Sequence, residues 1–269
     1  MKLPDAGSQD YKKQASPDEI SLSADERFAL EFLLSAFLWL DIHAHISARA
    51  RFSQQVDYIL VLEKGNVRLE NLFGCKTWVL ILILKISELD IWKKECEENQ
   101  RLSVAELAKL GLQIEAALNH GLAGILAQTT CEDTLPGIPT TEDRSLQITK
   151  VFALAALTYL HVVVSGAQPD LPEIRDSVAR SMDILEDLSR QDNLETVVWP
   201  ACITGCMASK DRQDNFRRLV TVEGVPDNGG NLPRAIEIVE LCWKDREAGL
   251  QNCEWSSVMK HQGQTVLLV

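Results

Sequence analysis

The sequence lacks the short motifs that identify the common enzyme classes. It has no Gly-rich phosphate loop, no Gly-x-Ser-x-Gly turn and no His-Glu-x-x-His pair. It also has no Cys-x-x-Cys pair, which excludes a zinc ribbon and a thioredoxin-type redox site. We therefore predict no metal site and no cofactor.

Basic residues are also scarce. The 27 lysines and arginines are outnumbered by 39 aspartates and glutamates, which gives a formal net charge of −12. A surface of that sign repels the phosphates of nucleic acid and anionic lipid. We expect no direct contact with nucleic acid by this chain alone.

Nothing in the sequence indicates export or a membrane span. The seven cysteines are an odd number and lie mostly in apolar or helical runs, as reduced thiols do. Residues 1–27 contain charges throughout and no apolar run long enough for a signal peptide. The most apolar segment, 151–166, has 16 residues, short of the roughly 20 that a span needs. We therefore expect a cytoplasmic or nuclear protein, or both, with no membrane span.

The apolar residues predict an all-α fold. They make up 46% of the chain with the charged residues at 25%, which predicts a packed core. Every long apolar run has helical spacing, and no alternating strand pattern or internal repeat is present. We predict a flexible polar leader at 1–22 and one helical domain at 23–269, with about eight to ten helices around an apolar core. A subdivision is possible near 129–142, where Pro136, Gly137 and Pro139 predict a loop.

Two capping-box patterns locate the starts of long helices. Ser23 with Glu26 predicts a helix from Ala24 to about Arg49, and Ser103 with Glu106 predicts one to about residue 127. Apolar residues surround the first helix from residue 28 to 42, so we expect it to be enclosed by protein. Further helices are predicted at 74–94, at 151–166, after Pro172, at 198–208, at 232–248 with Asn231 as cap, and at 253–261.

A few polar side chains in these apolar helices could carry chemistry. Asp41 and His45 are four residues apart, so the carboxylate could orient the imidazole. Tyr159 and His161 are polar groups in the helix at 151–166. Each also has a purely structural explanation, because a buried histidine with a partner is common. Cys202 and Cys206 could begin a metal site, but no third ligand lies near them in the sequence, which favours packing.

Six stretches in order resemble one known family. They are FLWLDI at 37–42, GCKTWVLILILKISELDIWK at 74–93, VFALAALTYLHVVVSG at 151–166, VWPACITGCMA at 198–208, RAIEIVELCWKDR at 234–246, and CEWSSVM at 253–259 with the closing VLLV. The chain is similar, from about residue 23 onward, to the fungal-specific transcription factor domain, the C-terminal regulatory region of fungal binuclear zinc-cluster transcription factors such as sterol-uptake regulators. The resemblance implies an all-helical fold with an apolar pocket for a sterol-like ligand, which governs a separate DNA-binding segment.

The chain departs from this family in one respect. The six-cysteine zinc cluster of such regulators is not present, and no cysteine precedes Cys75. The chain is therefore expected to be either an excised regulatory domain or a stand-alone protein without the DNA-binding segment.

Two functions are consistent with these observations. The first is a regulatory domain that binds a hydrophobic small molecule in a helical pocket, with a protein partner or a second copy as possible partners. The second is a cofactor-independent cyclase or isomerase of fungal specialised metabolism that uses the same pocket. The ligand-binding candidates are Phe37, Trp39, His45, Trp78, Phe152, Tyr159, His161, Trp199, Cys202 and Met207. If the chain is an enzyme, the candidate catalytic residues are Asp41, His43, His45, Tyr159 and His161.

Overall fold

The computed structural model describes residues 23–49, 56–65, 67, 69–129, 141–191, 194–221, 230–250, 253–263 and 266–269. Within these ranges the chain forms eleven α-helices, one short 3-10 helix and no strand, which confirms the all-α prediction. The helices are α1 (Ala24–Ala48), α2 (Tyr58–Lys64), α3 (Glu70–Phe73), α4 (Thr77–Glu98), α5 (Val104–Thr129), α6 (Thr141–Ser165), α7 (Pro172–Ser189), η1 (Leu194–Thr196), α8 (Val198–Cys206), α9 (Gln213–Val220), α10 (Asn231–Glu247) and α11 (Trp255–His261). The predicted leader and most of the predicted loop at 129–142 lie outside the described residues.

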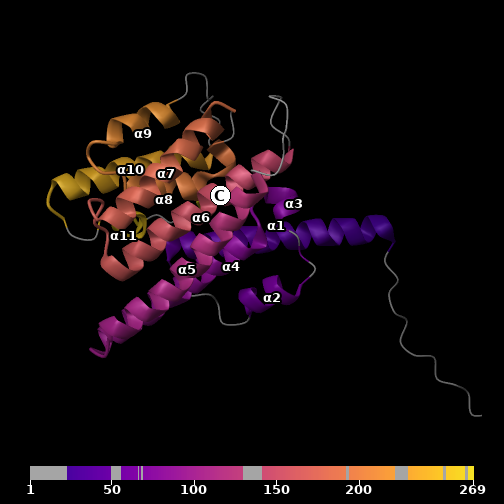
Figure 1. The fold of residues 1–269 in the computed structure, drawn as a ribbon, viewed down its shortest axis with the longest axis horizontal. Helices are drawn as coiled ribbons and strands as arrows, with labels where there is room; N and C mark the ends of the chain where they lie inside the picture. The colour runs from indigo at the N-terminus through magenta and orange to yellow at the C-terminus, as the bar shows by residue number, and fades with distance from the viewer. Residues whose placement is uncertain are drawn as a thin grey trace, which may run out of the picture.

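Helix α6 is the centre of the fold. It packs against α4, α5, α7 and α8 (Figure 1). The side chains from Val151 to Val163 are buried, apart from the half-buried His161, because every face of this stretch meets a neighbouring helix. The predicted core helix is therefore confirmed. It begins ten residues earlier than predicted, and Glu142 and Asp143 in its first turn suit the positive end of the helix dipole.

The C-terminal helices form a second group beside α6. Helix α10 packs against α8, where the Trp243 indole donates a hydrogen bond of 2.9 Å to the Gly205 carbonyl. The prediction that Asn231 caps α10 is wrong. Gly230 is the N-cap and Asn231 is the first helical residue, and its side-chain amide instead donates to the Val269 carbonyl at 3.1 Å.

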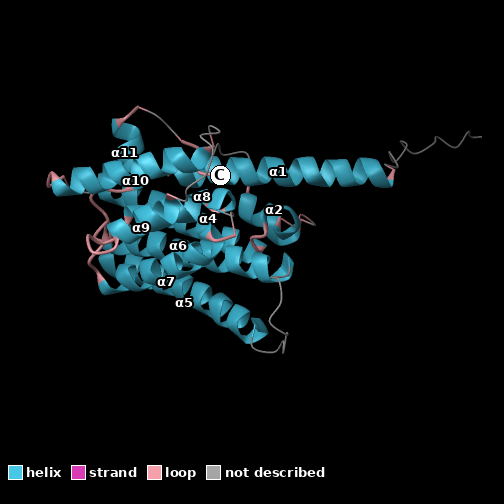
Figure 2. Cartoon of the chain, turned by 90° about the horizontal axis from the view of Figure 1, so that it is seen from above, coloured by secondary structure: helices cyan, strands magenta, loops and turns pink. Residues whose placement is uncertain are grey.

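Helix α1 is only half enclosed. The predicted capping box is present, since the Ser23 hydroxyl accepts from the Glu26 backbone and the Glu26 carboxylate accepts from the Ser23 backbone. The C-terminal half buries Leu38, Trp39 and Ile42 against the other helices. The N-terminal half projects beyond them (Figures 1 and 2). The prediction that protein surrounds this helix is wrong for that half, because the described residues nearest to it, Val67, Asn71 and Leu72, leave Phe28 and Phe32 largely exposed.

Two helices are long and apolar enough to cross a membrane by length and composition. One is residues 142–165 of α6, whose apolar window is 78% buried inside the fold. That burial identifies it as the core helix described above. The other is α1, whose window is 33% buried.

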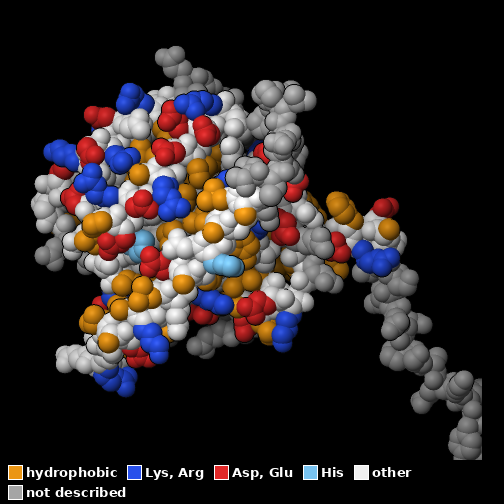
Figure 3. All heavy atoms as spheres, in the orientation of Figure 1, with side chains coloured by type: hydrophobic (Ala, Val, Ile, Leu, Met, Phe, Trp, Pro, Cys, Tyr) orange, Lys and Arg blue, Asp and Glu red, His pale blue; other side chains and the backbone are white. Residues whose placement is uncertain are grey.

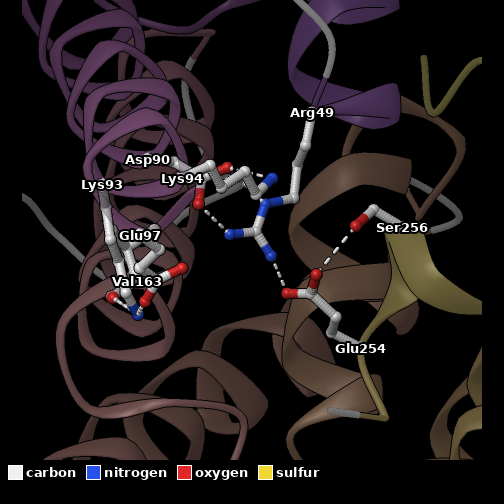
Figure 4. Close-up of polar contacts among 8 residues, drawn as sticks. All are labelled: Arg49, Asp90, Lys93, Lys94, Glu97, Val163, Glu254 and Ser256. Atoms are coloured by element: carbon white, nitrogen blue, oxygen red, sulfur yellow. Dashed lines mark hydrogen bonds and ion pairs between the residues drawn. The ribbon is translucent and has the colours of Figure 1, made fainter. Parts of the chain in front are cut away.

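A buried charged cluster joins α1, α4 and α11. Arg49, in the left-handed conformation that ends α1, forms ion pairs with Asp90 and Glu254 (Figure 4). Lys94 also contacts Asp90 at 2.8 Å, and the Ser256 hydroxyl donates to Glu254 at 2.8 Å. Burial alone would raise the pKa of Asp90, but the hydrogen bonds and charges of Arg49 and Lys94 outweigh it and hold that pKa below its ordinary value. The cluster therefore stays charged and fixes the end of α1.

Candidate functional site

A cavity of about 370 Å³ lies between α1, α3, α6, the start of α8 and the last two residues of the chain. We call it the aromatic cavity. Its lining residues are Trp39, His43, Glu70, Asn71, Leu72, Phe73, Gly74, Arg144, Ser145, Ile148, Phe152, Glu195, Thr196, Val198, Trp199, Leu268 and Val269. The volume falls in the range of small-molecule sites.

Aromatic rings form two walls of the cavity. The Trp39 and Phe73 rings are stacked with centroids 4.3 Å apart, and the Phe152 and Trp199 rings are stacked at 6.0 Å. The Trp39 and Phe152 centroids, one from each wall, are 5.7 Å apart. Such rigid apolar surfaces favour an apolar guest.

Hydrogen bonds between α3 and α6 hold the first wall in place. Gly74, with φ of 72°, ends α3 directly after Phe73. The Ser145 and Thr149 hydroxyls of α6 donate to the Gly74 carbonyl at 2.8 and 3.2 Å. A Cβ atom at Gly74 would lie 2.8 Å from the Ile148 side chain, and the positive φ disfavours any other residue. The sequence around Gly74 therefore fixes the position of Phe73.

Three residues that line the cavity carry a buried nitrogen with no hydrogen-bond partner among the described residues, and one of these atoms is Arg144 Nε. His43 and Trp199 are both fully buried, and the other two unpaired atoms are His43 Nε2 and Trp199 Nε1. The His43 Nδ1 atom lies 2.9 Å from the Trp39 carbonyl, which can only accept, so Nδ1 carries the proton. Burial lowers the pKa of His43 to about 4. Near neutral pH His43 Nε2 is therefore an unpaired buried acceptor, and the Trp199 indole N–H and the Arg144 Nε–H are unpaired buried donors.

Asp41 and His45 lie outside this cavity. The His45 ring nitrogen Nδ1 contacts the Asp41 backbone carbonyl at 2.7 Å and lies 3.8 Å from the Asp41 carboxylate. That carboxylate instead accepts a hydrogen bond from the Tyr58 hydroxyl of α2. The predicted Asp41–His45 pair is thus close in space, but the carboxylate is not the group that orients the imidazole.

Tyr159 and His161 also lie elsewhere. Tyr159 is fully buried, its ring is 5.4 Å from the Trp255 ring, and burial raises its pKa. His161 faces α5, where its Nε2 atom is 3.6 Å from Glu115. The sequence predicted that Tyr159, His161 and His45 line one cavity, and the structure does not bring them together.

Of the other ligand-binding candidates, Trp39, Phe152 and Trp199 line the cavity, as does His43 from the candidate catalytic set. Phe37 is 60% exposed on α1. Trp78 packs on Gly121 of α5, and Cys202 faces α10 through a 3.9 Å contact with the Ala235 carbonyl. Met207 is buried at the end of α8.

Several lining residues gave no signal in the sequence. Phe73 belongs to a helix of four residues, too short to show a period. Arg144 and Ser145 precede the start predicted for α6. Leu268 belongs to the closing VLLV of the family resemblance, but it follows the last predicted helix and was not assigned to a pocket. Gly74, at the start of an apolar run, was the available signal for a sharp turn.

The described residues contain no group of three His, Cys, Asp or Glu side chains arranged to hold a metal ion. Cys75 and Cys206 are fully buried, and burial raises the pKa of both thiols. These cysteines are therefore protonated near neutral pH and serve as small apolar residues of the core.

Comparison with known proteins gives one family and a consistent set of relatives. The family described as fungal specific transcription factor domain matches residues 7–269. The chain is 35% identical over 254 residues to the trichothecene biosynthesis transcription regulator TRI10 of Fusarium sporotrichioides, covering 93% of this chain and 57% of that protein. It is 33% identical over 265 residues to the protein of the same name from Trichoderma arundinaceum, covering 95% and 58%.

A more distant relative is the ustiloxin B cluster transcription factor of Aspergillus flavus, 29% identical over 253 residues, covering 90% of this chain and 43% of that protein. No solved structure matches the chain. The chain thus spans a little over half the length of the two trichothecene regulators.

Proposed function

Because the chain belongs to the fungal specific transcription factor domain family, we propose that it is a regulatory domain governed by a hydrophobic small molecule held in the aromatic cavity. Its relatives are named as transcription regulators or transcription factors of biosynthetic clusters, which supports a regulatory role. Because its net charge is −12, the chain does not contact DNA itself. It acts in the nucleus or the cytoplasm, and it acts on DNA through a DNA-binding partner or a separate DNA-binding segment. Binding of the molecule shifts the population of two conformations.

The observation that carries the proposal is that two side chains lining the cavity, His43 and Trp199, each hold a buried nitrogen without a hydrogen-bond partner. A buried polar group without a partner costs free energy, on the order of 1–3 kcal/mol, which a bound ligand can recover. His43 Nε2 accepts and Trp199 Nε1 donates, and a hydroxyl group both donates and accepts. The cavity therefore suits an apolar molecule that carries a hydroxyl group.

Borneol and camphor test this preference. They share a compact apolar skeleton, but borneol has a hydroxyl group where camphor has a carbonyl, which cannot donate to His43. We expect borneol to bind more tightly by about fivefold or more, since each hydrogen bond contributes about 1 kcal/mol. Isothermal titration calorimetry with the full chain measures both affinities.

A variant pair assigns the preference to the cavity. His43→Leu removes the acceptor and should abolish the difference between borneol and camphor, whereas His161→Leu, outside the cavity, should preserve it. Equal affinities for the two compounds in the parent chain would contradict the assignment of a hydroxyl ligand. If apolar alcohols of this size fail to bind at all, the aromatic cavity is not a ligand site.

The enzyme hypothesis has no comparable observation in its favour. Its candidate catalytic residues are dispersed, since His43 lines the aromatic cavity, Asp41 contacts Tyr58, and His161 faces α5. We therefore do not propose a catalysed reaction.

A further inference from the structure

The projecting helix α1 carries an exposed apolar row on its outer face. The row consists of Leu30, Leu33, Phe37 and Leu40, which are 55%, 64%, 60% and 45% exposed. We call it the outer row. The successive spacings of three, four and three residues are those of the a and d positions in a coiled coil. This spacing is typical of a helix that packs along its length against a second helix.

The outer row is separate from the residues that hold α1 on the domain. Ser35, Trp39, Ile42 and Ile46 are buried at spacings of four, three and four residues. They form an inner row that faces the other helices. Helix α1 therefore has two helix-packing faces, and the described part of the chain occupies one of them.

We propose that the outer row binds the outer row of a second copy of this chain, with the two α1 helices antiparallel. The row is symmetric along the helix about residue 35. Residues 30 and 40 are equally far from this centre, and so are residues 33 and 37. A two-fold axis at that point therefore places each row on itself, with Leu33 against the partner's Phe37. Self-complementarity about a two-fold axis is the requirement for a symmetric dimer.

Charges along α1 favour the antiparallel direction. Arg27 is the one basic residue between Ala24 and Ile42, and Asp41 lies near the other end of the row. With Leu30 and Phe37 as a positions and Leu33 and Leu40 as d positions, Arg27 and Asp41 both occupy e positions. In an antiparallel pair the e positions of the two helices face each other. Arg27 then lies beside the partner's Asp41, whose side chain is 28% exposed. A parallel pair would place the two copies of Arg27 at the same level instead.

The shape of the molecule leaves room for this pairing. The N-terminal half of α1 projects beyond the other helices, with hydrophobic side chains visible along it (Figures 1 and 3). In an antiparallel pair the partner's domain lies beside that projecting half. The four side chains of the outer row expose on the order of 400 Å² per copy, about half the area that each partner buries in a standard specific interface, which suits a weak dimer.

A membrane is the alternative occupant, because α1 meets the length and composition of a span. The stretch without charge is too short for that. Glu31 and Asp41 limit the uncharged run to nine residues, about 14 Å of helix, against about 30 Å of hydrocarbon. In the dimer neither Glu31 nor Asp41 belongs to the outer row, so neither carboxylate has to be buried.

Sedimentation equilibrium of the full chain tests the proposal. We expect the parent chain to dimerise in the micromolar range, and Leu33→Lys to raise the dimer dissociation constant about 30-fold or more. Leu112→Lys on α5 is the matched control, because Leu112 is also 64% exposed and lies outside the row. The control should dimerise like the parent. Both substitutions replace exposed side chains, and circular dichroism checks that both variants fold.

Disulfide formation tests the direction. In the antiparallel pair Leu30 faces the partner's Leu40, so a mixture of Leu30→Cys and Leu40→Cys chains should form the mixed disulfide, while Leu30→Cys alone should not link to itself. The parent chain, with its own cysteines, is the control. A parent chain that stays monomeric, a Leu33→Lys variant that dimerises like the parent, or self-linking of Leu30→Cys would each overturn the proposal. So would binding of a monomeric parent to phosphatidylcholine and phosphatidylserine vesicles that Leu33→Lys abolishes.

Discussion

The buried histidine of the aromatic cavity should make the stability of the fold depend on pH. Burial lowers the pKa of His43 from 6.5 to about 4. Above pH 6.5 the imidazole is neutral in both the folded and the unfolded chain, so it adds no pH dependence. Between pH 6.5 and 4 only the unfolded chain gains this proton, and the free energy of unfolding should fall by about 3 kcal/mol.

Urea unfolding of the parent and of His43→Gln, at pH 7 and at pH 4.5, measures this effect. The glutamine keeps a polar side chain but does not titrate, so the variant should lose less stability on acidification than the parent. The difference between the two chains removes the contribution of the carboxylates they share. Equal losses in the two chains would show that His43 becomes protonated within the fold.

At the scale of elements, the packing of α4 on α5 depends on one glycine. A Cβ atom at Gly121 would lie 2.4 Å from the Trp78 ring, whereas one at Gly124, a turn further along the same helix, would meet nothing within 4 Å. Alanine favours a helix over glycine by about 1 kcal/mol in both places. We expect Gly124→Ala to stabilise the protein by up to about 1 kcal/mol and Gly121→Ala to destabilise it by about 1–3 kcal/mol.

Thermal unfolding of the two variants beside the parent measures this contrast. Because both substitutions have the same effect on helix propensity, the difference between them reports the contact with Trp78. Two variants of equal stability would mean that the indole moves aside at no cost, and that α4 and α5 are loosely packed.

The elements that sequence reasoning located are those with a long period or a defined cap. Ser23 and Glu26 predicted the start of α1, and the uninterrupted apolar run around Leu154 predicted the core helix. Spacing within one helix says which side chains share a face, but not which neighbour covers that face. This is why the exposure of Phe37 was not predicted, and why His45 and Tyr159 were assigned to a cavity that they do not line.

The aromatic cavity itself is a property of the whole molecule. Its walls come from five parts of the chain, so that Phe73, Trp199 and Leu268 meet only after the helices have packed. Tryptophan and phenylalanine in apolar helices predicted that some aromatic side chains would line a pocket. Which of them do so depends on helix orientations that no local pattern records.

The net charge of the whole molecule leads to a prediction about DNA. With −12 charges and no zinc cluster, the purified chain should show no sequence-specific binding to duplex DNA at about 0.15 M salt. Fluorescence anisotropy with labelled promoter duplexes, and footprinting on the same fragments, measure this. A protected site produced by this chain alone would contradict the prediction and the regulatory arrangement proposed above.

The aromatic walls also give the molecule an intrinsic optical signal. Trp39 and Trp199 belong to different walls of the cavity, whereas the remaining four of the six tryptophans do not line it. A guest that enters replaces whatever surrounds these two indoles, and so changes their emission, while the other four provide a constant background. Single Trp39→Phe and Trp199→Phe chains would then separate the signals of the two walls. Intrinsic fluorescence can thus screen a compound library against the unlabelled protein and indicate which wall each compound touches.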